Sequence, residues 1–340
     1  MINDAIERLT KGEDLTFELM RAVMNEIMTG SAPFDEIASF LIALKEKTET
    51  PDEISAAASV LREKAITIRP RVDRLIDTCG TGGDGLCTFN ISTLVSFALS
   101  AYGIPVAKHG NRSVSSSCGS ADIIESLGIP LIKDKDILEK AIEEVGFGYI
   151  FAPYYHPAMK YAMPVRKKLG VRTIFNILGP LANPAAPNYQ ILGVYDESLL
   201  DPVVNALKNL NLNAALVVHA QDGMDEISIF TTTSARLLKN GEIKSFKINP
   251  EDILSQKADK NVLKVNGINE AKEKAEKVLN GIDSPELDSV AINAGWALFM
   301  LEEVEDAREG YEKIKALLKN RKVLDKFNQI YNYFKNVSPQ

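Results

Sequence analysis

The apolar positions of the first 70 residues have the spacing of helices. Between Thr16 and Gly30 apolar side chains recur every three or four residues, which predicts a helix capped by Thr16 and ended by Gly30. A second amphipathic run covers residues 34–44. The sequence TPDE at 50–53 then supplies the capping residue, the first-turn proline and the glutamate of a capping box. We therefore expect a small helical domain over residues 1–70.

The first long helix has an apolar stripe that is rich in methionine and permits two interpretations. The stripe consists of Leu19, Met20, Val23, Met24, Ile27 and Met28. It can be ordinary core. It can also be a self-association face, because so small a helical unit has more apolar faces than it can easily bury alone.

From residue 75 onward, short apolar strands alternate with helices. The strand candidates are 104–107, 148–152, 190–195 and 214–218, and the helix candidates are 92–102, 122–127, 137–145 and 202–210. This alternation predicts a mostly parallel central sheet with helices on both faces. Asn240-Gly241 indicates a hairpin and thus an antiparallel portion, and the chain reads as helical again from about residue 271. We expect residues 71–340 to form the larger α/β domain.

Composition narrows the class of protein. The formal net charge is −7, whereas general nucleic-acid binders carry a basic excess, so no nucleic-acid partner is expected. Cys79, Cys87 and Cys118 form no CxxC pair, which favours reduced thiols. No apolar stretch approaches the roughly 20 residues of a membrane span, and the first residues lack the apolar core of a signal peptide. We therefore expect a cytoplasmic protein without a membrane partner.

The first segment with candidate chemistry is DTCGTGGDG at 77–85, directly after a strand. Four glycines in six residues let the main chain approach a ligand closely, with its N–H groups turned outward. An ordinary tight turn is the alternative. Asn90, Ser92 and Thr93 follow at the start of a helix, where free N–H groups and the helix dipole bind phosphate. Capping would explain one such residue but not three.

The second segment is KHGNRSVSS at 108–116, followed by GSAD at 119–122. We expect the strand before it to lead into a loop with two cations, several hydroxyls, an amide and a glycine. That mixture suits a highly charged phosphate ester, although a solvated surface loop is the alternative.

The third segment, DGMDE at 222–226, follows the strand at 214–218. Adjacent carboxylates are costly unless they are exposed or neutralised, and Mg²⁺ would neutralise them. A solvated acidic turn is the alternative. Because ligands of parallel sheets bind beyond the carboxyl ends of the strands, all three segments should project into one site.

The fourth segment runs from residue 151 to 184 and is punctuated by proline and glycine. Its part from 155 to 185 is expected to be a hinge and a contact with the helical domain. Arg166 is either a surface cation or a bidentate ligand of a carboxylate.

These strings together resemble the anthranilate phosphoribosyltransferases. GTGGD at 80–84, NIST at 90–93, KHGNRSVSS with GSAD, RTIFNILGPLANP at 172–184 and DGMDE occur in the order and approximate spacing of that family, over nearly the whole chain. The resemblance implies the nucleoside phosphorylase-like fold, in which the active site lies between the two domains. It also implies a homodimer joined through the helical domain.

The resemblance further implies transfer of the 5-phosphoribosyl group from phosphoribosyl pyrophosphate to the amine of anthranilate, a step of tryptophan biosynthesis. The phosphoribosyl pyrophosphate contacts it implies are Gly80, Gly83, Asp84, Thr88, Asn90, Ile91, Ser92, Thr93, Lys108, His109, Gly110, Asn111, Arg112, Ser113, Val114, Ser115, Ser116 and Ser120. The anthranilate contacts it implies are Gly80, His109, Asn111, His156 and Arg166.

Two Mg²⁺ ions per active site are implied, held by Ser92, Asp225 and Glu226. The residues expected to carry catalysis are Lys108, Arg112, Asp225 and Glu226. Two alternatives remain at this point. One is a pyrimidine nucleoside phosphorylase of the same fold, and the other is a non-catalytic homologue that binds nucleic acid.

Overall fold

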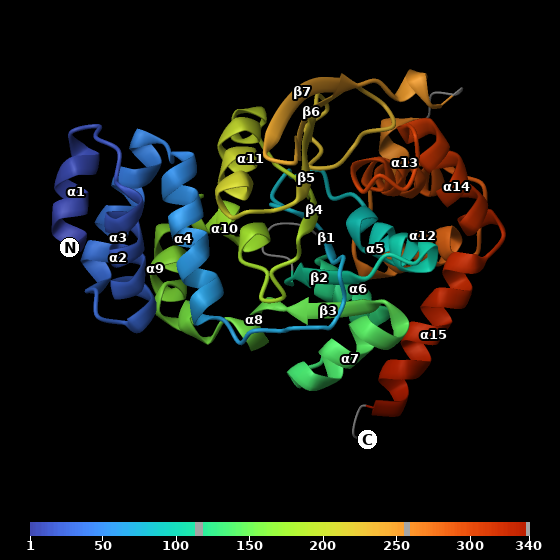
Figure 1. Ribbon diagram of the computed structural model, residues 1–340, viewed down its shortest axis with the longest axis horizontal. Coiled ribbons are helices and arrows are strands. Elements are labelled where there is room, and N and C mark those ends of the chain that lie inside the picture. The colour runs from blue at the N-terminus through green and yellow to red at the C-terminus, as the bar shows by residue number, and fades with distance from the viewer. Residues whose placement is uncertain (113–117, 255–258, 338–340) are drawn as a thin grey trace.

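The computed structural model describes residues 1–112, 118–254 and 259–337 of the chain (Figure 1). Four helices open it: α1 (Ile2–Thr10), α2 (Phe17–Thr29), α3 (Phe34–Lys47) and α4 (Pro51–Lys64). Thr16 caps α2 through the N–H of Leu19, and Gly30 ends that helix in the left-handed region. Thr50 and Glu53 form the predicted capping box of α4. The helical N-terminal part is therefore confirmed, down to its caps.

The rest of the described chain is built on one seven-stranded sheet of order β3-β2-β1-β4-β5-β6-β7. The strands are β1 (Ile76–Gly80), β2 (Val106–Gly110), β3 (Phe147–Phe151), β4 (Tyr189–Gly193), β5 (Ala214–Ala220), β6 (Thr233–Lys239) and β7 (Glu242–Ile248). The first five strands in this order pair in parallel, and β5, β6 and β7 pair antiparallel. The predicted mostly parallel sheet and the hairpin at Asn240-Gly241 are both confirmed.

Helices cover both faces of the sheet (Figure 1). Those within the α/β part are α5 (Ile91–Tyr102), α6 (Ser120–Ser126), α7 (Lys135–Val145), α8 (Ala152–Tyr155), α9 (Met163–Leu169), α10 (Phe175–Leu181), α11 (Leu200–Asn209), α12 (Ile268–Leu279), α13 (Pro285–Met300), α14 (Ala307–Lys319) and α15 (Lys322–Val337). Among the described residues no helix is both long and apolar enough to cross a membrane.

Two hydrophobic cores divide the molecule. One lies between the sheet and helices α5, α13 and α15. The other joins α1–α4 to α9, α10, α11 and the opposite face of the sheet. The methionine-rich stripe of α2 belongs to this second core, since Met20, Met24 and Met28 are buried there. Its interpretation as ordinary core is therefore correct.

Segment 155–185 packs against the N-terminal helices. The N–H of Ile66 donates to the carbonyl of Tyr155 (2.8 Å), and Nε of Arg62 donates to the carbonyl of Leu181 (2.7 Å). The predicted contact with the helical part is thus present, whereas the hinge and the boundary at residue 70 stay predictions.

Candidate active site

The site lies where the order of the sheet reverses. The chain runs outward from β1 to β2 and β3, then returns to place β4 on the other side of β1. Strands β1 and β4 end level with each other, because Gly80 pairs with Gly193. The N–H of Thr81 donates to the carbonyl of Gly193 (2.9 Å), and Thr81 Oγ1 accepts from the N–H of Tyr195 (3.0 Å). Ligands of such sheets bind beyond the strand ends at this reversal.

Asp225 packs directly on these two strand ends. Its Oδ2 accepts the N–H of Gly82 at 2.9 Å, which joins the acidic segment to the glycine-rich loop. A Cβ at Gly80 would lie 2.3 Å from Oδ2 of Asp225, and a Cβ at Gly193 would lie 1.4 Å from its carbonyl oxygen. Glycine is therefore required at both strand ends so that the acidic segment can approach.

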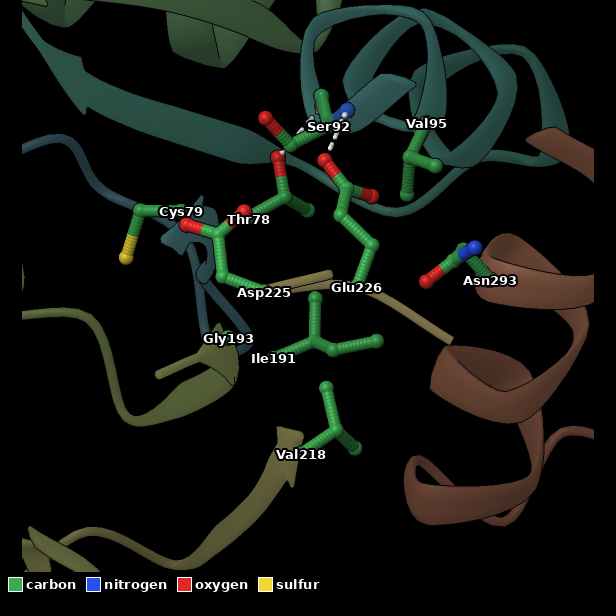
Figure 2. Close-up of a pocket in the computed structure, with 10 residues that line it drawn as sticks. All are labelled: Thr78, Cys79, Ser92, Val95, Ile191, Gly193, Val218, Asp225, Glu226 and Asn293. Carbon is green, nitrogen blue, oxygen red and sulfur yellow. Dashed lines mark hydrogen bonds between the residues drawn. The ribbon is translucent and has the colours of Figure 1, made fainter. Parts of the chain in front are cut away.

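Glu226 lies at the start of α5. Its Oε1 accepts the N–H of Ser92 at 3.2 Å, in the first turn of that helix, where the helix dipole favours negative charge. Figure 2 shows Asp225 and Glu226 side by side in one pocket. The pocket is lined by Thr78, Cys79, Ser92, Val95, Ile191, Gly193, Val218, Asp225, Glu226 and Asn293.

The two carboxylates are costly in the ionised state. Burial, followed by the charge of Asp84, raises the pKa of Asp225 to about 6. Burial, followed by the charge of Asp225, raises the pKa of Glu226 well above its ordinary value. Burial also raises the pKa of Asp84, although the N–H of Leu86 donates to its Oδ1. The acidic pair therefore has too little positive charge around it in the protein alone.

The donor set fits Mg²⁺. The carboxylates of Asp225 and Glu226 and the hydroxyl of Ser92 are hard oxygen donors. Within the described ranges no group of three or more His, Cys, Asp and Glu residues is arranged to hold a metal by itself. Mg²⁺ commonly binds through one or two carboxylates, with substrate phosphates and water completing its shell. The site thus suits an ion that arrives with a phosphorylated substrate.

The structure corrects the predicted surroundings of Lys108. Strand β2 continues through Gly110, so Lys108 lies within the strand and not in the loop after it. Its side chain is only 1% exposed and donates to the carbonyl of Thr78 and to Oγ of Ser92 (3.2 Å). Burial lowers the pKa of this ammonium, while the nearby Asp77 opposes that shift. Lys108 therefore contacts the pocket only indirectly, through the hydrogen bond from its Nζ to Oγ of Ser92, a residue that lines the pocket.

Arg112, which is predicted to contact phosphate, forms two ion pairs within the protein. Its guanidinium is paired with Asp122 (2.7 Å) and Glu125 (2.6 Å), both on α6, and is half-exposed. In the described structure it is therefore held by α6 and not by the acidic pair. The predicted contacts Ser113, Val114, Ser115 and Ser116 lie outside the described residues.

The remaining predicted phosphate ligands surround the same strand ends. Oγ of Ser120 lies 2.8 Å from the hydroxyl of Tyr149 and donates to the carbonyl of Asn111 (3.3 Å). A Cβ at Gly110 would fall 2.3 Å from Ser120 Oγ, so glycine is required there too. Others lie on the loop or at the start of α5: Gly83, Asp84, Thr88, Asn90, Ile91 and Thr93. Thr93 is fully buried and faces away from solvent.

His109 and His156 form a buried pair. Their Nε2 atoms are 3.2 Å apart, and Nδ1 of His109 lies 3.0 Å from the carbonyl of Gly179. Because a carbonyl only accepts, neutral His109 carries its proton on Nδ1 and has a bare Nε2. That Nε2 accepts a hydrogen bond from Nε2–H of His156. Burial lowers the pKa of His109 to about 3 and that of His156 to about 4. Both rings are therefore neutral at pH 7. With pKa values this low, neither ring is basic enough to serve as a general base.

Arg166 is a half-buried cation on α9. Its guanidinium lies 5.3 Å from the ring centre of Phe175, and its Nη1 is 3.7 Å from Sδ of Met163. Burial lowers its pKa. It forms no ion pair with any residue in the described ranges, so its charge is available to the carboxylate of a ligand.

Two residues beside the site were not predicted. Arg172 donates to the carbonyl of Gly83 and stacks on the ring of Tyr195 with its Cζ 4.0 Å from the ring centre, which ties the segment before α10 to the glycine-rich loop. Asn293 lines the pocket from α13. Its sequence signal was an amide within an otherwise apolar helical run, 290–298.

The chain matches known proteins along nearly its whole length. Residues 72–323 match the family described as "Glycosyl transferase family, a/b domain", and residues 3–65 match the "Glycosyl transferase family, helical bundle domain". The chain is 43% identical to the anthranilate phosphoribosyltransferase of Persephonella marina over 338 residues, covering 98% of this chain and 99% of that protein. It is 44% identical to that of Clostridium beijerinckii over 334 residues, covering 97% and 98%.

Solved structures agree. The anthranilate phosphoribosyltransferase of Thermus thermophilus superposes with a TM-score of 0.91 at 36% identity, covering 98% of this chain and 99% of that one. The Saccharomyces cerevisiae enzyme, solved in complex with PRPP and Mg, superposes with a TM-score of 0.90 at 23% identity, covering 99% and 98%. This chain belongs to the anthranilate phosphoribosyltransferase family.

Proposed function

We propose that this protein transfers the 5-phosphoribosyl group from phosphoribosyl pyrophosphate to the amine of anthranilate, an early step of tryptophan biosynthesis. One observation carries the proposal: Asp225 and Glu226 are held between the glycine-rich loop and the first turn of α5, with pKa values raised by burial and by neighbouring carboxylates. Relatives of 43–44% identity that bear this activity in their names support it.

The donor would bind across the ends of β1, β2 and β5. Main-chain N–H groups of the glycine-rich loop and the first turn of α5 are suited to its phosphates. Two Mg²⁺ ions, held by Ser92, Asp225 and Glu226, would neutralise the pyrophosphate when bound. Lys108 would add positive charge through Ser92, and Arg112 would do so after leaving Asp122 and Glu125.

The acceptor would bind on the side of the hinge segment. The free guanidinium of Arg166 is suited to the carboxylate of anthranilate, and Gly80, Asn111 and the neutral pair His109–His156 would line its place. The bond from C1 of the ribose to pyrophosphate breaks as the amine nitrogen bonds to C1 from the opposite face. The nitrogen then loses one proton. Positioning and charge neutralisation carry this chemistry, since it needs no covalent nucleophile.

The decisive experiment mixes the protein with anthranilate, phosphoribosyl pyrophosphate and Mg²⁺ and follows anthranilate fluorescence. We expect the fluorescence to fall as anthranilate is consumed. One pyrophosphate should appear for each anthranilate that is consumed. Unchanged fluorescence would overturn the acceptor assignment. Release of a free base from a pyrimidine nucleoside and phosphate would point instead to the phosphorylase of the same fold.

The assembly is a further part of this proposal. Met1, Phe34 and Ile42 are exposed apolar side chains of the N-terminal helices, which favours a homodimer joined there. Light scattering on the eluting protein should give twice the chain mass of 37.3 kDa. Phe34→Asp together with Ile42→Asp should return the mass to that of one chain. An unchanged mass in that variant would exclude this face.

Movement of the two parts is the last element of the proposal. We place domain 1–70 on one wall of the cleft and domain 71–340 on the other, with 155–185 as the hinge between them. Closure would exclude water, which would otherwise hydrolyse the donor. X-ray scattering should record a smaller radius of gyration with both substrates than with neither. A cytoplasmic location is also part of the proposal, because the three cysteines form no CxxC pair and their count is odd.

A further inference from the structure

Asn293 is a polar residue in an apolar setting. It lies on α13, is 2% exposed, and has Ile292 and Ala294 buried on either side of it in the chain. A buried amide is costly unless both its hydrogens and its oxygen are bonded. The partners of Asn293 therefore explain why an amide stands in this helix.

All the hydrogen-bonding groups of that amide are used. Oδ1 accepts the N–H of Ile227 at 2.9 Å, and Nδ2 donates to the carbonyl of Ile227 at 3.0 Å. The second hydrogen of Nδ2 goes to the carbonyl of Ser289 at 2.9 Å, one turn earlier in α13. Asn293 thus clamps both main-chain groups of one residue and is itself fixed to its own helix.

The clamped residue comes directly after the acidic pair. The N–H of Ile227 belongs to the peptide group that also carries the carbonyl of Glu226, so the clamp fixes the main chain from which the Glu226 side chain projects. Residues 221–228 form no helix or strand, so bonds from other segments hold this stretch of main chain, and those of Asn293 are the ones next to Glu226 on its C-terminal side. Figure 2 shows Asn293 facing the same pocket as Glu226.

The helix that carries the clamp is held rigidly. A Cβ at Gly295 would lie 2.5 Å from the nitrogen of Tyr311, and a Cβ at Gly310 would lie 2.4 Å from the carbonyl oxygen of Gly295. The main chains of α13 and α14 are therefore in direct contact. Helix α5, which supplies the Ser92 N–H to Glu226, packs against α13 as well. Both anchors of Glu226 come from one rigid group of helices.

We propose that Asn293 is a positioning residue of the metal site: by clamping Ile227 it holds the Glu226 carboxylate where the magnesium and pyrophosphate of the donor bind. The inference rests on the proposed function for the identity of that ligand. Outer residues that orient metal ligands commonly contribute 10- to 100-fold to metal affinity.

The test compares two variants that lose the same kind of clamp. Asn293→Asp keeps the size of the side chain, removes the amide donor and sets an oxygen against the carbonyl of Ile227. Asn188→Asp is the matched control: Oδ1 of Asn188 accepts the N–H of Leu75 (2.8 Å) and its Nδ2 donates to the carbonyl of Asp73 (3.0 Å), at the opposite end of β1. Both variants should lose thermal stability.

The readout is Mn²⁺ binding, measured from the loss of the free-ion electron paramagnetic resonance signal at saturating phosphoribosyl pyrophosphate. We expect Asn293→Asp to weaken Mn²⁺ binding at least about tenfold, and Asn188→Asp to leave it within about twofold of the parent. Equal Mn²⁺ affinity in both variants would overturn the inference and leave Asn293 a residue of stability alone. If Asn293→Asp is unfolded at the assay temperature, Asn293→Ser, which keeps a smaller polar group, is held to the same criterion.

Failure of the proposed function gives a different result. A parent protein that binds Mn²⁺ with the donor but does not consume anthranilate refutes the acceptor, while the comparison of Asn293→Asp with Asn188→Asp still decides the role of Asn293. A parent protein that binds no Mn²⁺ in the presence of the donor overturns both.

Discussion

The two sides of the site are built in opposite ways. On the side where we propose that phosphate binds, Asp225 and Glu226 are held beside each other, and their pKa values are raised. On the side where we propose that the acceptor binds, His109 and His156 are hydrogen-bonded to each other as neutral rings, and their pKa values are lowered. If the proposed function is right, the first side binds a cation that the protein does not supply. The second side has neutral rings and, in the described part of the chain, an Arg166 without an ion pair.

We expect the largest effect from removing both carboxylate charges, those of Asp225 and Glu226. Asp225→Asn with Glu226→Gln should lower kcat/KM by about 10³-fold or more, because the charge that holds the metal is lost. The variant should unfold at the same or a higher temperature, since two carboxylates with raised pKa values are replaced. Retained activity with a lower melting temperature would contradict the metal assignment.

A methyl group at Gly193 tests the close approach of the acidic segment. Gly193→Ala places a Cβ 1.4 Å from the carbonyl oxygen of Asp225, so the segment must move. We expect loss of Mg²⁺-dependent activity and a destabilisation of about 3 kcal/mol or more in urea unfolding. Gly148→Ala in β3 is the control: its Cβ would lie 2.7 Å from the Ile142 side chain of α7. This variant should lose stability without raising the Mg²⁺ requirement.

Arg166 tests the acceptor side alone. Arg166→Ala should raise the KM for anthranilate about 10- to 100-fold, which corresponds to about 1.4–2.7 kcal/mol, with the KM for phosphoribosyl pyrophosphate unchanged. Lys168→Ala on the same helix is the control, because its ammonium lies over the ring of Phe34 and not in the site. A rise in both KM values for Arg166→Ala would show that the two sides are not separate.

The smallest expected effect is on the pH dependence of the free energy of unfolding. Asp225 makes this free energy fall as pH rises, whereas His109 and His156 make it fall as pH drops. The pKa of Asp225 is raised to about 6 from 3.8, so its burial destabilises the fold increasingly as pH rises from about 4 to 6. The pKa values of His109 and His156 are lowered to about 3 and about 4 from 6.5, so their contribution is lost as pH falls below about 6.5.

Single substitutions separate the contribution of Asp225 to the pH dependence of stability from that of the two histidines. Without Mg²⁺, Asp225→Asn should gain on the order of 1–2 kcal/mol relative to the parent between pH 4 and pH 6. His109→Gln should weaken the loss of stability below pH 6.5 by a similar amount. Urea unfolding at each pH measures both. Parallel curves for parent and variant would refute the corresponding pKa shift.

The sequence predicted what depends on local chemistry. The caps at Thr16 and Thr50, the end at Gly30 and the turn at Asn240-Gly241 each rest on a few neighbouring residues, and each was found. Strand ends were less accurate, because pairing partners decide them. The candidate strand 104–107 became Val106–Gly110, since β2 pairs with β3 as far as Phe151.

The site was predictable as a set of segments but not as a set of contacts. The meeting of the glycine-rich loop, the start of α5 and the acidic segment follows from parallel strands that end at one edge. The burial of Lys108 depends on Thr78, 30 residues away, which no spacing along the chain reveals. The pairing of Arg112 with Asp122, ten residues on, depends on how the chain folds back between them. Asn293 was missed for the same reason, since its partner Ile227 is 66 residues away.

The hairpin of β6 and β7 has a consequence for behaviour in a crowded solution. Strand β7 is the last of the sheet, so within residues 1–112, 118–254 and 259–337 one row of its main-chain groups has no neighbouring strand. A free edge of this kind can template pairing with other copies and start aggregation. Glu242, Lys244 and Lys247 are exposed along it, and bringing two such strands together would strip water from these charged side chains. The charged β7 edge thereby disfavours the addition of a strand from another molecule to this sheet.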